Sequence, residues 1–408
     1  MILVAIVMLV IIGFAALAID IGHLFVVRNE LKNAADAGAL AGARVLLNAD
    51  GTVNTGADAV AMAAATANKS EKQAVEVTLA ADVKRGHWSF ATEQFTPNNS
   101  TAAIPLWDVS TAELDANPDF INAIWVQTWR QQSPALSFFA RILGFFGFVV
   151  RDEAVGYVGF AGTLEPEAVD QPIAICLQSI LDPNTGAYTC NTGRMIDSGG
   201  GTTHNTGAWT NFEQPCSTAS VPTVRPLVCG DGNPLGIDLG EGMGTTGGMQ
   251  DNVYRDLRDC WLHFTTNRDS RGYPMEFWPL TLPVIDCPGN NPGPCSEARG
   301  AVTLNVIWIK DTGTDSHWMD IPLQMEDWTC DQGTDISSLT EVQRHQCWRD
   351  FTDHFNLRTS DGTSAGDLTP TQLQKTMFFQ PDCTPHIPIG RTGGADYGVR
   401  AKYPVLVK

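Results

Sequence analysis

The chain begins with an apolar stretch that is long enough to cross a lipid bilayer, and this limits what the rest can fold into. Residues 1–19, MILVAIVMLVIIGFAALAI, contain no charged side chain. A helix rises about 1.5 Å per residue, so this segment spans about 28 Å, close to the hydrocarbon thickness of a bilayer. We therefore predict a helix that lies in a membrane or in the core of a filament. A cleaved secretory signal is the less favoured alternative, because the helical pattern continues without a clear small-x-small cleavage site.

The helical pattern runs on beyond the apolar segment. Residues 20–48 contain no proline and are rich in Ala, Leu, Arg, Glu and Lys, which favour helix. We predict one continuous helix of about 45 residues, near 70 Å long. Small residues recur four apart on two faces of its second half, which lets another backbone approach closely. This surface packs either against the chain's own globular domain or against other subunits. The residues are Ala34, Gly38 and Gly42 on one face, and Ala35, Ala39 and Ala43 on the next.

All ten cysteines lie beyond residue 175, and none belongs to a CxxC pair. An even count without metal-binding spacing predicts a disulfide framework and an oxidising compartment. The absence of CxxC also argues against structural zinc. The sequence leaves the pairing of the cysteines open. The candidates are Cys176, Cys190, Cys216, Cys229, Cys260, Cys287, Cys295, Cys330, Cys347 and Cys383.

The charge of the chain argues against one class of partner. The formal net charge is −19, and neutralising nucleic-acid phosphates needs clustered Lys and Arg, so we predict no nucleic-acid partner. The sequence contains no GxSxG, HExxH or Walker motif. We therefore predict that the protein is not an enzyme.

The charges that flank the apolar segment conflict with the cysteines. No Lys or Arg precedes the segment, whereas Arg28 and Lys32 follow it, so the positive-inside rule alone would place the body in the cytoplasm. Disulfides require the opposite side. A processed chain, from which a basic leader has been removed before Met1, reconciles the two. We expect an inner-membrane anchor with a periplasmic or extracellular body, or an extracellular filament.

Hydrophobic periodicity divides the rest of the chain into two domains. In residues 49–165 we predict a helix over 57–74, strands over 75–90, 121–130 and 148–162, and a short helix after Pro134 within 136–147. In residues 166–408, short apolar runs alternate with glycine-rich turns. Here we predict strands over 172–180, 301–310 and 403–408, and helices over 252–264 and 341–355, the latter capped by Ser338 or Thr340. The fold class is α+β: the helix of residues 1–48, a small α/β domain, and a β-rich, loop-heavy domain held together by disulfides.

Two further features suggest ligands. Acidic turns place oxygen atoms on loops, as calcium requires, although none of them has the DxDxDG pattern. Apart from calcium at these turns, we predict no metal and no cofactor. Of the eleven tryptophans, we expect most to fill cores or subunit contacts, with a carbohydrate-stacking surface as the alternative. The weak calcium candidates are Asp182, Asp231, Asp238, Asp311, Asp315, Asp361 and Asp367; the tryptophans considered are Trp125, Trp129, Trp261, Trp278, Trp308, Trp318, Trp328 and Trp348.

The segment AIDIGHLFVVRNELKNAADAGALAGAR resembles the N-terminal signature of TadE/TadG-like proteins of the tight-adherence (Flp) pilus system. The signature residues are Asp20, Gly22, Arg28, Leu31 and Asp36, followed by an Ala-Leu-Ala-Gly run. The resemblance covers about residues 1–165, more loosely through 83–97 and 137–159. It implies a pilin-like domain in an envelope-anchored structural protein without implying an activity. Ala5 departs from the glutamate of ordinary pilins, and the DxSxS metal motif of some relatives is absent.

Two functional hypotheses follow. The first is a structural, pilus-associated protein or filament subunit that assembles through its N-terminal helix. Its partners would be copies of itself or other pilus subunits, with the membrane contacted through residues 1–19. The second is a tip-located adhesin or carbohydrate-binding module anchored by the same helix.

Overall fold

The computed structural model of the chain has two compact units. Unit 1 comprises residues 1–104, 109–159 and 402–408, and unit 2 comprises residues 105–108 and 160–401. The residues described are 2–48, 52–102, 104, 109–181, 190, 207–248, 251–264, 266–290, 292–311, 321, 325, 328, 330, 335–358, 363–368, 373–386, 392, 401 and 403–408.

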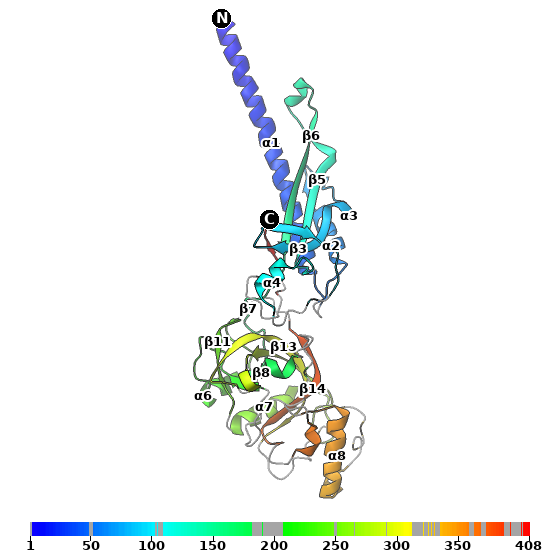
Figure 1. The fold of residues 1–408 in the computed structure, drawn as a ribbon, viewed down its shortest axis with the longest axis vertical. Helices are drawn as coiled ribbons and strands as arrows, with labels where there is room; N and C mark the ends of the chain where they lie inside the picture. The colour runs from blue at the N-terminus through cyan, green and yellow to red at the C-terminus, as the bar shows by residue number, and fades with distance from the viewer. Residues whose placement is uncertain are drawn as a thin grey trace. The chain divides into compact units, whose positions relative to one another are not determined.

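Unit 1 is organised around the long helix α1, which runs without interruption over Ile2–Arg44 (Figure 1). The predicted continuous helix is therefore confirmed. By length and composition, α1 is able to cross a membrane. The proposed separation of residues 1–48 from the next domain differs from the structure, because the second half of α1 is part of the core of unit 1.

A five-stranded antiparallel sheet packs against α1. The strands are β3 (Val83–Ser89), β4 (Gln94–Pro97), β5 (Ala123–Leu136), β6 (Gly147–Tyr157) and β15 (Val405–Leu406), in the order β15-β6-β5-β3-β4. The side chains of β5 alternate as predicted: Ile124, Val126 and Thr128 are buried, while Trp125 is half-buried on the opposite face. The core of unit 1 thus lies between α1, the sheet and α2 (Ala57–Thr66).

Several predicted boundaries in unit 1 differ from the structure. The helix predicted over 57–74 ends at Thr66, because the chain then turns back at Glu71 and Lys72, both with positive φ, between β1 (Lys69–Ser70) and β2 (Gln73–Ala74). The strand predicted over 75–90 begins at Val83 and is preceded by α3 (Leu79–Asp82). The other elements are α4 (Thr111–Ala116) and η1 (Ala140–Leu143), the short helix predicted after Pro134.

Unit 2 contains a sheet in which five strands close into a ring. Its order is β11-β9-β8-β12-β13-β14, and β11 also pairs with the start of β13. The pair β8 and β12 is parallel and the other pairs are antiparallel. The strands are β8 (Ile173–Cys176), β9 (Gly207–Thr210), β11 (Gly242–Thr246), β12 (Trp278–Ile285), β13 (Cys295–Lys310) and β14 (Thr376–Pro385), with β7 (Thr163–Leu164) pairing β10 (Ile237–Asp238) separately.

Helices cover this sheet. Both long helices occur where they were predicted, as α7 (Asp251–Phe264) and α8 (Glu341–His354), and Thr340 caps α8 by accepting a hydrogen bond from the N–H of Gln343. The strand predicted over 172–180 stops at Cys176, where α5 (Leu177–Ile180) begins. The shorter helices are α6 (Val221–Val224), η2 (Arg225–Leu227), η3 (Pro288–Asn290), η4 (Ile336–Ser338) and η5 (Ala365–Asp367).

All ten cysteines form disulfides, and all five bridges lie in unit 2. The predicted framework is confirmed. Three of the bridges join segments that are 79 to 193 residues apart, so they fix loops that a small sheet alone would hold weakly. The pairs are Cys176–Cys287, Cys190–Cys383, Cys216–Cys295, Cys229–Cys260 and Cys330–Cys347.

Candidate functional site

The small residues of α1 pack against the chain's own helix α2 and sheet. A Cβ atom at Gly42 would lie 2.6 Å from the Cβ of Ala61 and 2.9 Å from Cδ1 of Ile124, and one at Gly38 would meet Ala65 and Val126 at similar distances. Such contacts leave room for hydrogen alone. Of the two alternatives for this surface, the structure shows packing within the chain: the buried residues are Ala34, Ala35, Gly38, Ala39, Gly42 and Ala43.

The sheet approaches α1 equally closely from the other side. A Cβ atom at Gly156 of β6 would lie 2.4 Å from the carbonyl oxygen of Ala39. The helix backbone therefore rests directly on the strand backbone at this point. Close approach from two directions holds the second half of α1 in a fixed position.

Polar contacts add to this packing. Nε of Arg28 lies 2.8 Å from Oδ2 of Asp152, and Nζ of Lys32 donates to the carbonyl oxygen of Glu153 (2.9 Å) and pairs with Asp36 (3.2 Å). The Arg28 side chain is 62% exposed, so its ion pair is worth at most about 1 kcal/mol. The buried hydroxyl of Thr128 donates to the carbonyl oxygen of Leu31 (2.9 Å).

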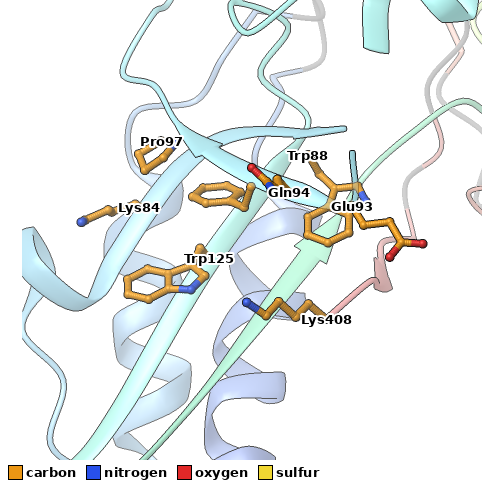
Figure 2. A pocket seen from close by; sticks show the side chains of 8 residues that line it. Lys84, Trp88, Glu93, Gln94, Pro97, Trp125 and Lys408 are labelled. Carbon is orange, nitrogen blue, oxygen red and sulfur yellow. The ribbon is translucent and has the colours of Figure 1, made fainter. Parts of the chain in front are cut away.

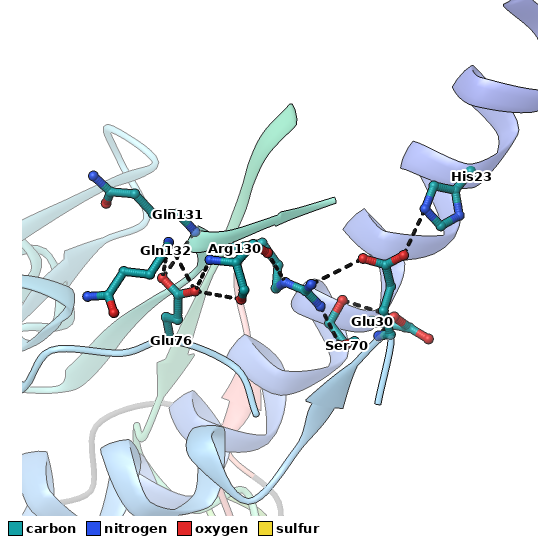
Figure 3. A network of polar contacts seen from close by, with 9 residues as sticks. His23, Glu30, Ser70, Glu76, Arg130, Gln131 and Gln132 are labelled. Atoms are coloured by element: carbon teal, nitrogen blue, oxygen red, sulfur yellow. Dashed lines mark hydrogen bonds and ion pairs between the residues drawn. The ribbon is translucent and has the colours of Figure 1, made fainter. Parts of the chain in front are cut away.

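A polar network links the middle of α1 to the turn after β1 and to β5 (Figure 3). Oε2 of Glu30 accepts hydrogen bonds from Ser70 Oγ (3.0 Å) and from the N–H of Glu71 (2.9 Å). The Glu71 carboxylate lies 2.9 Å from Nε2 of His23 and 3.2 Å from the guanidinium of the buried Arg130. The network therefore crosses from α1 to β5 by two routes, through the Glu71 carboxylate and through Ser70, whose carbonyl accepts a hydrogen bond from Arg130.

Glu76 binds the next part of β5, residues 131–133. Its carboxylate accepts hydrogen bonds from the backbone N–H groups of Gln131, Gln132 and Ser133, at 2.9 to 3.1 Å (Figure 3). Burial raises the pKa of Glu76, but these bonds and the Ser133 hydroxyl outweigh it, so the pKa lies below its ordinary value. Glu71, Glu76 and Arg130 were not singled out from the sequence, because nothing in their local pattern indicates contacts 41 to 60 residues away.

Asp20 stands where the apolar segment ends and has a role that the sequence did not indicate. Its carboxylate accepts hydrogen bonds from the backbone N–H groups of Phe138 (2.7 Å), Phe139 (3.1 Å) and Ala140 (2.6 Å). These groups lie at the start of η1, so Asp20 satisfies N–H groups that a helix terminus leaves free. The side chain is only 5% exposed. The connection between β5 and β6 is thereby tied to α1.

The remaining signature residues differ in what surrounds them. Leu31 is fully buried in the core of unit 1, whereas a Cβ at Gly22 would meet nothing within 4 Å. The large apolar side chains before Asp20 that the structure describes are 50–76% exposed. This exposed surface comprises Leu3, Val4, Val7, Met8, Val10, Ile11, Ile12, Phe14, Leu17 and Ile19.

The face of the sheet that carries Trp125 contains a hollow of about 360 Å³ (Figure 2). Trp88, Phe95 and Trp125 line it together with Lys84 and Lys408. Nζ of Lys84 lies 5.5 Å from the centre of the Trp125 ring, and the Trp125 N–H donates to Glu153 (3.1 Å). The hollow therefore combines aromatic surface with charges of both signs, because Glu93 also lines it and Nζ of Lys408 pairs with Glu153 (2.6 Å).

The other tryptophans do not form a comparable binding surface in the described part of the chain. Trp261, Trp278, Trp308, Trp328 and Trp348 are buried, as expected of core residues, while Trp129 is half-buried and donates to Asp82 (2.9 Å). Trp318, Asp182, Asp315 and Asp361 lie outside the described residues.

Asp367 pairs with Arg349 (3.2 Å), and Asp231 and Asp238 are exposed, while Asp311 is half-buried. Within the described part of the chain, no three His, Cys, Asp or Glu side chains gather as metal ligands would. Calcium binding at these turns stays a prediction.

Two family models match the N-terminal part of the chain. Residues 1–45 match the Flp pilus-assembly TadE/G-like family, and residues 41–155 match the Tad-like Flp pilus-assembly family. No curated protein and no solved structure matches the chain. The matched region contains Asp20, the small-residue faces of α1 and the strands β3 to β6. Residues 1–155 of this chain thus match families of Flp pilus-assembly proteins, which confirms the resemblance to TadE/TadG-like proteins.

Proposed function

We propose that this protein is a non-catalytic structural subunit of a Flp-type pilus system, which associates with copies of itself or with other pilus subunits through the first half of α1. The family match and the apolar helix support the coarser statement that it is a pilus-associated envelope protein anchored in a membrane.

One observation carries this proposal: the two halves of α1 have opposite surroundings. Most small and apolar side chains of residues 27–43 are buried in unit 1, whereas the large apolar side chains described between Leu3 and Ile19 are 50–76% exposed. At roughly 25 cal/mol per Å² of exposed apolar surface, such a helix requires lipid or other helices around it. This segment, continued by the exposed Ile21, Phe25 and Val26, is therefore the apolar surface of α1 that lipid or partners can reach.

Photo-crosslinking tests the proposal. We would place p-benzoylphenylalanine at Phe14 in the full chain, in cells that contain the complete pilus system, and at the exposed Val342 of unit 2 as the control. We expect crosslinks from Phe14 to this chain or to another pilus subunit, and none of these from Val342. Membrane-bound protein whose Phe14 crosslinks to lipid alone would contradict assembly while leaving the anchor intact.

The hollow in Figure 2 favours a second candidate function, binding of an acidic carbohydrate at Trp125. Aromatic rings stack on sugar rings, and Lys84 supplies positive charge for an acidic group, whereas Lys408 is paired with Glu153. Titration of the protein with acidic oligosaccharides, compared with Trp125→Ala and with a control Trp129→Ala, tests this. Equal binding by all three proteins would exclude the hollow as the site.

A further inference from the structure

We propose that the tip of the β5–β6 hairpin, residues 136–146, inserts into the same bilayer leaflet that surrounds α1 and forms a second membrane contact. This inference rests on the membrane anchoring of α1 but not on its assembly with other subunits.

The hairpin tip carries a dense cluster of exposed apolar side chains. Ile142 is 81% exposed, and its neighbours in the tip range from 39% to 79%. Contiguous apolar patches of this kind are rare on surfaces that face water. The members of the cluster are Leu136, Phe138, Phe139, Ile142, Leu143, Phe145 and Phe146.

The tip lies at the level of the apolar half of α1. The strand β5 runs antiparallel to the helix: Thr128 contacts the carbonyl of Leu31, and ten residues later Phe138 donates to Asp20. The ring of Phe138 also lies 4.9 Å from that of His23. Residues beyond Phe138 therefore continue past Asp20 towards the N-terminus of α1, and η1 contacts the helix there (Figure 1).

Backbone N–H groups of the tip are hydrogen-bonded within the protein, as a medium without water requires. The N–H groups of Phe138, Phe139 and Ala140 donate to Asp20, and other N–H groups donate to carbonyls within the tip. Hydrocarbon tolerates only backbone whose polar groups are satisfied internally. The internal donors are Ser137, Ile142, Gly144 and Phe145, to the carbonyls of Phe146, Phe139, Arg141 and Ala140 respectively.

The polar side chains of the tip suit the same location. Ser137 is buried and donates to the carbonyl of Phe145. The exposed Arg141 donates to the carbonyl of Phe138 (2.9 Å), and a long basic side chain of this kind reaches lipid phosphates while its apolar stem stays in the hydrocarbon.

Lipid is the occupant that the surroundings favour over a second copy of the chain. Asp20 holds the start of η1 beside the exposed Ile19 and Ile21 of α1, so the two apolar surfaces are continuous. A bilayer that covers Ile19 and Leu17 therefore reaches the depth of Ile142 as well.

Spin-label accessibility tests this inference on the full chain. A nitroxide on p-acetylphenylalanine would replace Ile142, Phe14 or Val342, one at a time, in protein reconstituted into phosphatidylethanolamine and phosphatidylglycerol vesicles. The ratio of collisions with oxygen to collisions with a water-soluble nickel chelate reports depth. We expect several-fold higher ratios at Ile142 and Phe14 than at Val342, which is 80% exposed in unit 2.

The other outcomes overturn the inference in distinguishable ways. A ratio at Ile142 equal to that at Val342, with Phe14 in lipid, would show a hairpin tip in water and an intact anchor. Low ratios at both Phe14 and Ile142 would remove the anchor and the inference together. Dipolar broadening between Ile142 labels that disappears on dilution with unlabelled protein would show that a second copy covers the tip.

Discussion

Substitution of Gly42 by alanine tests whether α1 is fixed by close packing within its own chain. The new Cβ would lie 2.6 Å from the Cβ of Ala61 and 2.9 Å from Cδ1 of Ile124, with the Ala57 carbonyl at 3.3 Å. Carbon atoms normally approach to about 3.5–4.0 Å, so α2 has to move outward by roughly 1 Å. Because Ala57 and Ala61 are both fully buried, that movement disturbs the packing along α2.

The magnitude follows from two opposing terms. Overpacking of a well-packed core costs about 1–3 kcal/mol, whereas replacing glycine by alanine inside a helix gains about 1 kcal/mol. We expect the free energy of unfolding of unit 1 to fall by about 1 kcal/mol, which is roughly a fivefold change in the opening equilibrium. Gly22→Ala is the matched control in the same helix, because its Cβ meets nothing within 4 Å. Gly22→Ala gains the helix propensity of alanine without overpacking the core. The difference in unfolding free energy between the two variants therefore measures the cost of overpacking at Gly42.

Hydrogen exchange of the amides of β5 and β6, read by mass spectrometry in detergent, measures this difference within unit 1. We expect faster exchange of the most protected amides in Gly42→Ala and equal or slower exchange in Gly22→Ala. Equal protection of these amides in the two variants would show that α2 moves outward without loss of stability, and would refute the packing argument. Gly38→Ala offers a repeat of the test, since its Cβ would also contact Ala65 at 2.9 Å.

Three further predictions concern polar groups and disulfides. Asp20→Asn removes the charge that three N–H groups share, so we expect several-fold faster exchange of the amides of residues 138–140. Because the pKa of Glu76 is lowered in the folded chain, its contribution to stability is complete above the ordinary value of 4.5 and is lost as the pH falls through the folded pKa. Acid titration of unfolding should therefore be flatter below that pH in Glu76→Gln, and an unchanged slope would contradict the assignment. Reduction of the five disulfides should expose the amides of β12 and β13 while leaving β5 and β6 protected, because no cysteine lies in unit 1; loss of protection in both units would contradict this.

The parts of the fold that the sequence predicted are those encoded locally. The helix α1, the alternation along β5 and the long helices α7 and α8 follow from periodicity and composition over a few turns or residues. The even cysteine count likewise predicts bridges without knowledge of the fold.

The parts that were missed depend on distant contacts. The turn at Glu71 and Lys72 uses positive φ at two residues that rarely adopt it, so the end of α2 had no glycine to mark it. The strand β15 was placed with the second domain, yet it pairs with β6 of unit 1, about 250 residues earlier. Asp20 was known only as a signature residue, because its partners lie 118 to 120 residues away. One local signal was available: eight of the twelve residues 136–147 are apolar.

The use of the small residues within the chain limits how copies of this protein pack together. Gly38 and Gly42 are filled by α2 and β5, and Ala39 supports Gly156, so these two small-residue faces of α1 are not available for close backbone approach between copies. The exposed apolar surface left for helix contacts between copies lies within residues 2–26, which extend about 38 Å. The hairpin tip lies beside that segment at Asp20, which binds the tip's backbone N–H groups. Neighbouring helices must therefore approach from the remaining sides, and a crosslinker at Phe14 should capture them where one in the buried half of α1 cannot.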